Sequence, residues 1–352
     1  MIKKQQLNQK ISSQLRRKKS RKKILDFLLA MTILIGLSSL PFFPELIIQI
    51  DGTPAFSWVP DWNIERTLTD TNGKFLGYSK YRIFLYFLLI QIYALIAWLG
   101  WFSVSKNKPY KLAILLGVIC SSYHIFLILS NNRATYLNGI DIKLVGSAII
   151  GCILFLVYYF SEKKKKTQME YAQKKFGHKT KKIITFRVIL VWLFIFAAST
   201  FPYFHDIITL RGTGIKDWVP QFGIENALTD SAGYVWGFNS YRVFILTLSL
   251  QIFAQIGWAG WLHDSAYKLY RPFLVVPVGL SLYQIVVILM DQTGAYLNSP
   301  DIKLMIIFII SSVVCFFYFF RNKRFNQIEI DSKTVTAFTQ NQTKKPLSKY
   351  EK

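Results

Sequence analysis

Five pairs of charged residues recur in this sequence at a fixed separation of 160 residues, and they are the first candidates for chemistry. The set consists of Glu65 and Glu225, Asp70 and Asp230, Arg82 and Arg242, Asp141 and Asp301, and Lys143 and Lys303. The first three pairs could form a site for a charged solute or a protein partner. The alternative is structural: the arginines bond acids of their own segment, and Asp141 and Asp301 lie in the first turns of helices. We favour the structural interpretation, because helix starts commonly carry acids there, at about 0.5–1 kcal/mol each.

A second group consists of uncharged polar side chains inside long apolar runs. Its members are Gln91, His124, Gln251, Gln255 and Gln284. They could converge on a polar seam that conducts a solute, or they could hydrogen-bond neighbouring helices at about 0.6–2 kcal/mol each. Helix–helix bonding is the favoured interpretation. No Asp, Glu, Lys or Arg is expected deep in a membrane helix, and this argues against an ion-coupled carrier.

Signals for catalysis or metal binding are weak. The four histidines do not recur between the two related stretches, and none has a partner at the spacing of a metal or haem site on one helix. No nucleophile elbow, phosphate-binding glycine loop or His-Glu-x-x-His motif occurs. We therefore expect no catalytic residue, metal or cofactor, and an intramembrane enzyme ranks third among the functional hypotheses.

These residues are embedded in an internal repeat. Residues 52–144 align with residues 212–304 without a gap, including the paired motifs Trp-Val-Pro, Ile-Glu, Leu-Thr-Asp, Tyr-Arg, Trp-x-Gly-Trp and Asp-Ile-Lys-Leu. A gapless repeat of this length indicates one structural unit that is used twice.

Eight apolar runs divide evenly between the two copies. They cover residues 27–43, 83–104, 112–130 and 144–160, and then 188–204, 243–262, 273–290 and 304–320. A helix needs about 20 apolar residues to cross a bilayer. The sequence predicts an all-α polytopic membrane protein with two tandem four-helix transmembrane repeats and a small outer cap on each. An even number of crossings puts both copies in parallel orientation, packed side by side.

The distribution of charge predicts the orientation. The net charge is +24, and the basic residues concentrate in an arm at residues 1–23, a linker at 161–182 and a tail at 321–352, outside the repeats at 24–160 and 183–320. Positive segments stay cytoplasmic, so both termini are expected inside the cell and the protein in the inner (plasma) membrane. The arm is expected to contact the lipid bilayer and not nucleic acid.

Paired tryptophans mark the end of the second apolar run in each copy. Trp98 and Trp101, like Trp258 and Trp261, are expected in an aromatic belt at the membrane surface. Gly100 and Gly260 between them would permit two helices to approach closely.

Two functional hypotheses follow. The first is a membrane protein that binds a partner or ligand at its outer face, such as a periplasmic protein, in an accessory, assembly or immunity-like role. The second is a passive or facilitated transporter of a small solute, with its path between the two repeats.

Overall fold

The computed structural model describes residues 25–26, 28–44, 81–106, 108–129, 139–176, 186–208, 241–266, 268, 270–289 and 301–317. Side chains are described for the same residues except 81–83, 165–176 and 241–243. Within these ranges the chain is helical, with short turns and no strand. The all-α class predicted from the sequence is confirmed.

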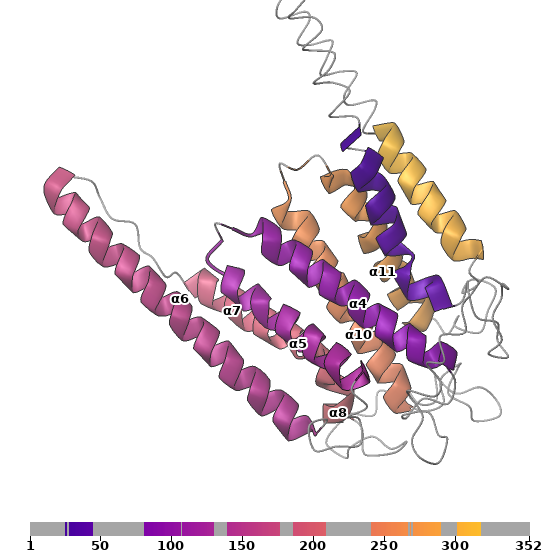
Figure 1. The fold of residues 1–352 in the computed structure, drawn as a ribbon, viewed down its shortest axis with the longest axis horizontal. Coiled ribbons are helices and arrows are strands. Elements are labelled where there is room, and N and C mark those ends of the chain that lie inside the picture. Colours follow the sequence, from indigo (N-terminus) through magenta and orange to yellow (C-terminus); the bar gives the residue numbers. More distant parts are fainter. Residues whose placement is uncertain are drawn as a thin grey trace, which may run out of the picture.

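The described helices follow one another in a simple up-and-down order (Figure 1). They are Leu28–Phe42, which ends in the 3-10 turn η1 (Leu40–Phe42), α4 (Tyr81–Val104), α5 (Lys111–Leu129), α6 (Ile140–Phe176), α7 (Phe186–Ser199), η4 (Phe201–Tyr203), α8 (Phe204–Ile208), α10 (Tyr241–Asp264), η5 (Arg271–Leu274), α11 (Val275–Leu289) and a last helix over residues 301–317.

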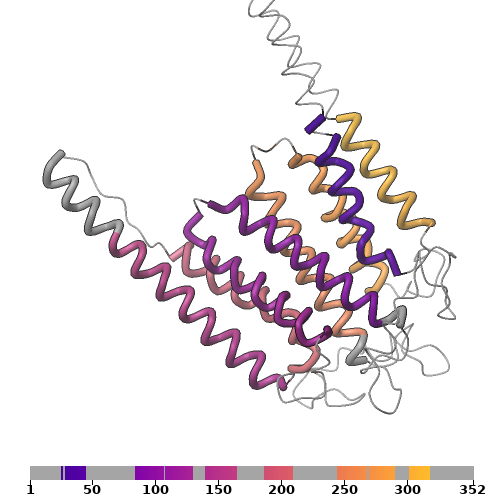
Figure 2. The backbone as a smooth tube through the Cα atoms, viewed as in Figure 1, coloured from indigo at the N-terminus to yellow at the C-terminus, as the bar shows by residue number. Residues whose placement is uncertain are grey.

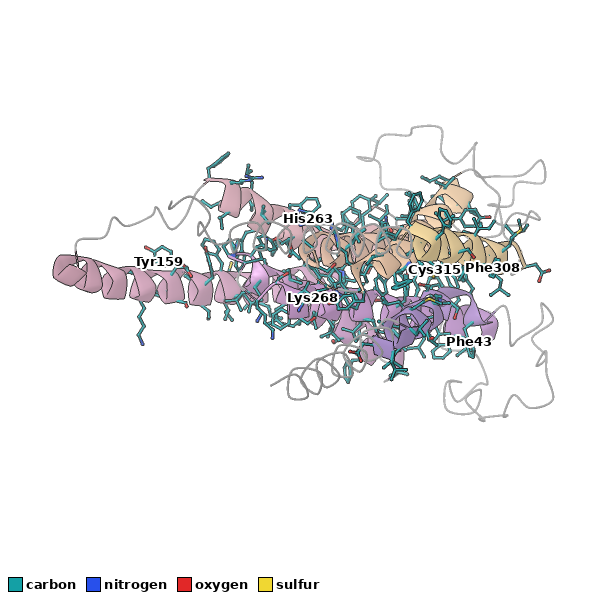
Figure 3. All side chains as sticks on the ribbon, turned by 90° about the horizontal axis from the view of Figure 1, so that it is seen from above. Phe43, Tyr159, His263, Lys268, Phe308 and Cys315 are labelled. Atoms are coloured by element: carbon teal, nitrogen blue, oxygen red, sulfur yellow. The ribbon has the colours of Figure 1, made fainter. Side chains whose placement is uncertain are left out.

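Six of these segments are long and apolar enough to cross a membrane. They are Phe84–Val104, Lys111–Leu129, Ile140–Lys164, Phe186–Ile208, Phe244–Asp264 and Arg271–Leu289. The apolar helices Leu28–Phe42 and 301–317 are shorter within the described residues. Large apolar side chains such as Phe308 and Phe316 are exposed on the outside of the bundle, as expected for a surface that faces lipid. Figure 3 shows Phe308 at that margin.

The centre of the bundle is the pair α4 and α10, which run side by side in Figures 1 and 2. Small residues recur at every third position of both helices where they face each other: Ala94, Ala97 and Gly100 on α4, and Ala254, Gly257 and Gly260 on α10. A Cβ atom on Gly100 would lie 2.1 Å from the ring of Trp261, and one on Gly260 would lie 2.3 Å from the ring of Trp101. Each glycine therefore accommodates a tryptophan of the opposite helix, and close packing of this kind holds apolar helices together inside lipid.

Three of the four tryptophans predicted for an aromatic belt are buried inside the bundle, and Trp261 is half-buried. Trp98 and Trp258 are 0% exposed and Trp101 is 7% exposed. Trp98 stacks on Phe253 at a centroid distance of 4.9 Å, and its Nε1 donates to the Phe253 carbonyl at 3.1 Å. The belt interpretation is wrong for these residues, because the glycines beside them let the rings bury themselves between α4 and α10.

The first helix of each sequence repeat packs on the third and fourth helices of the other repeat. Phe42 contacts Val276 and Leu280 of α11 and Ile307 of the last helix. Tyr203 contacts Leu116 and Cys120 of α5 in the same way.

The Cys315 and Met31 sulfur atoms lie 3.4 Å apart, which ties the last helix to the first (Cys315 is labelled in Figure 3). Figure 1 shows both neighbours: the indigo first helix beside the yellow last helix, and α7 beside α5. The two halves thus exchange their first helices, an arrangement that differs from two separate bundles side by side.

Candidate functional site

A buried ion pair lies at the end of the bundle where α6 begins and α8 ends. Lys143 Nζ is 2.7 Å from Asp206 Oδ2, and the two side chains are 2% and 8% exposed. His205 Nε2 lies 3.3 Å from the other carboxylate oxygen, Oδ1. Leaving one partner of a buried ion pair unpaired costs about 3–5 kcal/mol, so this contact constrains α6 and α8 strongly.

The local sequence explains how α8 presents these groups. Pro202 is the second residue of η4, which follows α7 after Thr200, and the Thr200 hydroxyl donates to the Ala197 carbonyl at 2.8 Å where the helix tightens. The tight turn directs Tyr203 inward, and it is 1% exposed. His205 Nδ1 lies 3.1 Å from the Pro202 carbonyl oxygen, which fixes the imidazole beside Asp206.

A second pair of polar side chains lies deeper in the bundle. Gln91 Nε2 is 2.8 Å from His124 Nδ1, and the Ser121 hydroxyl donates to the Gln91 carbonyl at 3.1 Å. Gln91 Oε1 and His124 Nε2 are buried and have no hydrogen-bond partner among the described residues. If the Gln91 amide is turned over, its oxygen accepts from His124 Nδ1–H, and each side chain still keeps one unpaired polar atom. A buried polar atom without a partner costs about 1–3 kcal/mol, and such atoms mark places where a ligand or water binds.

Tyr203 connects the two pairs. Its ring centroid lies 5.0 Å from that of His124 and 5.7 Å from Lys143 Nζ. Cys120 Sγ and Ser147 Oγ are 3.6 Å apart, and Cys120 packs against Tyr203. We call the connected set Gln91, His124, Lys143, Tyr203, His205 and Asp206 the polar cluster.

The corresponding place in the second repeat is more apolar. The Lys303 ammonium is 4.9 Å from the centroid of the Phe42 ring, which stands where the first repeat meets Tyr203. The positions that match Cys120 and Ser147 are Leu280 and Ile307, which join Phe42 in one apolar group.

The deep polar residues expected to form a seam are distributed between separate contacts. Gln91 bonds His124, whereas Gln251 Nε2 donates to the Tyr86 hydroxyl at 3.2 Å. Gln255 has a buried Oε1 without a partner, and Gln284 is 4% exposed. Among the described side chains, no hydrogen bond joins the Gln91 contact to the Gln251 contact.

The structure describes the side chains of some of the repeated charged residues and not of others. Glu65, Asp70, Glu225 and Asp230 lie outside the described residues, and Arg82 and Arg242 fall in the first turns of α4 and α10, where only the backbone is described. Asp141 and Asp301 are exposed in the first turns of their helices, and Lys143 and Lys303 are buried.

Sequence reasoning missed Tyr203, His205 and Asp206. The available signal was an acid followed by Ile207 and Ile208 at the end of an apolar run, where a charged group needs a partner.

The opposite end of the bundle holds another buried acid, Asp264, whose side chain is 0% exposed. Its carboxylate accepts hydrogen bonds from Trp101 Nε1 at 2.8 Å, from the Ser105 hydroxyl and from the Tyr110 hydroxyl at 2.9 Å. Lys108 Nζ is 3.8 Å away.

These four partners of Asp264 belong to the first repeat, whereas Asp264 ends α10, and the matching residue of α4 is Val104. We call this contact the Asp264 staple. Burial of the phenol, together with its hydrogen bond to Asp264 and the charge of that carboxylate, raises the pKa of Tyr110.

The two polar regions are separated along α4 by the buried tryptophans. Gln91 lies about 15 Å from the start of α4, at 1.5 Å per residue, and Trp98 and Trp101 follow before the Asp264 staple. Within the described residues, no group of three or more His, Cys, Asp or Glu side chains is placed to hold a metal ion.

The helices and the buried polar groups define a multi-pass helical membrane protein. Comparison of the chain with protein-family models, with curated proteins and with solved structures finds no match.

Proposed function

We propose that the chain is a duplicated four-helix unit with eight membrane helices, both copies parallel and both termini in the cytoplasm, in the plasma (bacterial inner) membrane. Matching hydrogen bonds support the duplication. Ser121 donates to the Gln91 carbonyl, and Ser281 donates to the Gln251 carbonyl. The basic arm, linker and tail support the orientation, because positive segments are retained on the cytoplasmic side.

In this orientation the polar cluster lies near the outer surface, and the function we propose is to bind a ligand or partner there, in an accessory, assembly or immunity-like role. The observation that carries the proposal is the buried Lys143–Asp206 pair beside the unpaired Nε2 of His124. Ionisable groups within membrane spans are costly and are kept mainly where they act on a solute, ion or partner.

The closed inner half of the bundle favours binding over transport. A path between the repeats would have to pass between α4 and α10, where Trp261 and Trp101 fill the space left by Gly100 and Gly260, and where Trp98 and Trp258 are fully buried. Tight packing of this kind leaves little room for a hydrated solute.

Transport remains the second candidate, because Gln91 and Gln251 are buried polar side chains within membrane spans. Its test is solute uptake by reconstituted vesicles, measured for the protein and for a Gln91→Leu/Gln251→Leu variant. Uptake by the protein that the double variant abolishes would favour this candidate.

Thiol labelling tests the proposed function directly, since Cys120 lies against Tyr203. Replacing Cys152 and Cys315 by serine leaves Cys120 as the single thiol. A charged, membrane-impermeant methanethiosulfonate is then added to right-side-out or inside-out membrane vesicles. The matched control is Leu280→Cys in a chain without other cysteines, because Leu280 occupies the same place in the apolar half.

Cys120 is 3% exposed, so the reagent reaches its thiol only when the polar cluster opens to water. We expect this modification in right-side-out vesicles only, and Leu280→Cys to be modified in neither. Modification of Cys120 from both sides would replace the proposal by a transporter. Absence of modification from the outer side, or equal modification of the control thiol, would refute an outer-facing polar site.

A further inference from the structure

Three buried polar atoms lie along one face of α10, on residues that do not belong to the polar cluster. Gln251 Oε1, Gln255 Oε1 and Trp258 Nε1 have no hydrogen-bond partner among the described residues, and the Gln251 and Trp258 side chains are 1% and 0% exposed. The three residues are spaced by four and three positions, so they share one face of the helix. At 1.5 Å per residue they cover about 10 Å of its length. We call this row the α10 stripe.

The matching row of the first repeat consists of Gln91, Leu95 and Trp98, and it leaves fewer polar atoms unpaired. Leu95 is apolar, and Trp98 Nε1 donates to the Phe253 carbonyl at 3.1 Å. Of these three residues, Gln91 alone keeps an unpaired side-chain atom among the described residues. The α10 stripe is therefore a feature of the second repeat and not a consequence of the duplication.

One glycine explains why the two tryptophans differ. A Cβ atom on Gly117 of α5 would lie 2.2 Å from the ring of Trp98, so this ring occupies space that a glycine leaves open. The matching residue of α11 is Pro277, which carries a Cβ atom and a ring. Trp258 therefore cannot take the equivalent position, and its N–H is left without the direct acceptor that Trp98 has.

The helices that carry and face the α10 stripe have no charged residue along their apolar stretches. α10 packs against α4 and α11 (Figure 1). The Tyr86 hydroxyl of α4 lies 3.2 Å from Gln251 Nε2, and the Tyr93 ring lies 5.0 Å from that of Trp258. The Ser281 hydroxyl of α11 donates to the Gln251 carbonyl at 3.3 Å. The stretches without Asp, Glu, Lys or Arg are residues 83–104, 243–262 and 273–290.

This setting favours a small neutral ligand that both donates and accepts hydrogen bonds, because a buried charge without a counter-charge is far more costly than a neutral polar group. We propose that the α10 stripe binds ordered water. One molecule accepts from Trp258 Nε1–H and donates to Gln255 Oε1, and a second donates to Gln255 Oε1 and Gln251 Oε1. If the Gln251 amide is turned over, its nitrogen donates to the second water instead. Buried waters commonly satisfy groups that have no other partner.

The test is radiolytic footprinting of the purified full-length protein in detergent. Ionising radiation converts water, including bound water, to hydroxyl radicals that oxidise adjacent side chains, and tandem mass spectrometry gives the rate for each tryptophan. Trp258 and Trp98 are a matched pair, because they occupy equivalent positions and both are 0% exposed. We expect Trp258 to be oxidised several-fold faster than Trp98, whose N–H bonds the protein directly.

Two variants connect the oxidation to the α10 stripe. Gln255→Leu introduces the residue type that the first repeat has at the matching position, and it removes the acceptor that both waters share. It should lower the oxidation rate of Trp258 to that of Trp98. Ser249→Ala is the control, because Ser249 lies on the opposite face of α10 and its hydroxyl donates to the Leu246 carbonyl at 2.9 Å. This variant should leave the rate unchanged.

Equal oxidation of Trp258 and Trp98 in the parent protein would overturn the proposal, as would fast oxidation of Trp258 that persists in Gln255→Leu. Gln255→Cys, in a chain without other cysteines, separates ordered water from bulk water. The charged methanethiosulfonate should leave this thiol unmodified in both vesicle orientations, and modification would replace ordered water by an open aqueous path. These readouts do not involve Cys120, so they succeed or fail independently of the proposed function.

Discussion

Replacement of Asp264 by asparagine should destabilise the protein strongly, because this single carboxylate accepts hydrogen bonds from residues spread over positions 101–110. It accepts hydrogen bonds from Trp101, Ser105 and Tyr110 while its own side chain is fully buried. Asparagine has the same shape but only one acceptor oxygen, and its amide would face a donor. The contact between the two repeats at this end would then be lost in part.

The expected loss of stability depends on whether each donor finds another acceptor after the substitution. Hydrogen bonds to a charged acceptor contribute about 1.5–3 kcal/mol each. The Ser105 hydroxyl already has the Trp101 carbonyl at 2.9 Å, and the half-buried Tyr110 hydroxyl can turn to water. The Trp101 N–H, on a 7% exposed side chain, is left unpaired. We therefore expect a loss of about 3 kcal/mol, one full bond with partial losses at the other two donors.

The assay is size-exclusion chromatography of detergent-solubilised protein after heating, which reports the fraction that stays monodisperse. A loss of this size corresponds to a melting temperature roughly 6–10 °C lower. Asp141→Asn is the matched control: it removes an exposed carboxylate from the first turn of α6, where the cost is at most about 1 kcal/mol. If Asp264→Asn melts within 1 °C of the control, the Asp264 staple does not hold the repeats together.

Two further predictions concern the same end of the bundle. Gly100→Ala should lower the melting temperature by several degrees, because a Cβ there would lie 2.1 Å from the Trp261 ring. Gly146→Ala is the control and should have no effect, because a Cβ there would have nothing within 4 Å. Equal melting temperatures of the two variants would contradict the packing of Gly100 against Trp261. The raised pKa of Tyr110 means that the folded state holds this proton more tightly than the unfolded state, so its contribution is complete below pH of about 10 and is lost as the pH rises above it. The melting temperature of Tyr110→Phe should then fall less between pH 9 and pH 11 than that of the parent, and parallel curves would exclude the effect.

The membrane class and the helices could be predicted from the sequence because they depend on local properties. A run such as residues 112–130 is apolar along its whole length, and α5 covers Lys111–Leu129. Hydrogen bonding of the backbone inside lipid leaves a helix as the solution for such a run. Because the apolar runs recur in both copies of the repeat, the helices predicted for one copy are predicted for the other as well.

The positions of the tryptophans could not be predicted in the same way. An aromatic residue near a helix end is compatible with a lipid interface or with a helix–helix contact, and composition does not distinguish them. Gly100 and Gly260 were the discriminating signal: each glycine creates the space that a tryptophan of the facing helix fills. The sequence contains both halves of this contact, but only the pairing of α4 with α10 brings them together.

The polar cluster could not be predicted from the sequence for a different reason. Gln91, His124 and Lys143 belong to one repeat, and Tyr203, His205 and Asp206 belong to the other. The ion pair exists because the first helix of the second repeat packs on α5 and α6, an exchange that no local pattern encodes. Alignment of the two repeats pairs residues of the same type that are 160 positions apart. Lys143 and Asp206 are 63 positions apart and differ in type, so the alignment does not bring them together.

The exchange of helices also explains why the two halves can differ without loss of the fold. The apolar group around Phe42, Val276 and Ile307 holds one first helix against the other repeat. The matching place in the other half carries polar groups whose burial costs stability, such as the Lys143–Asp206 pair.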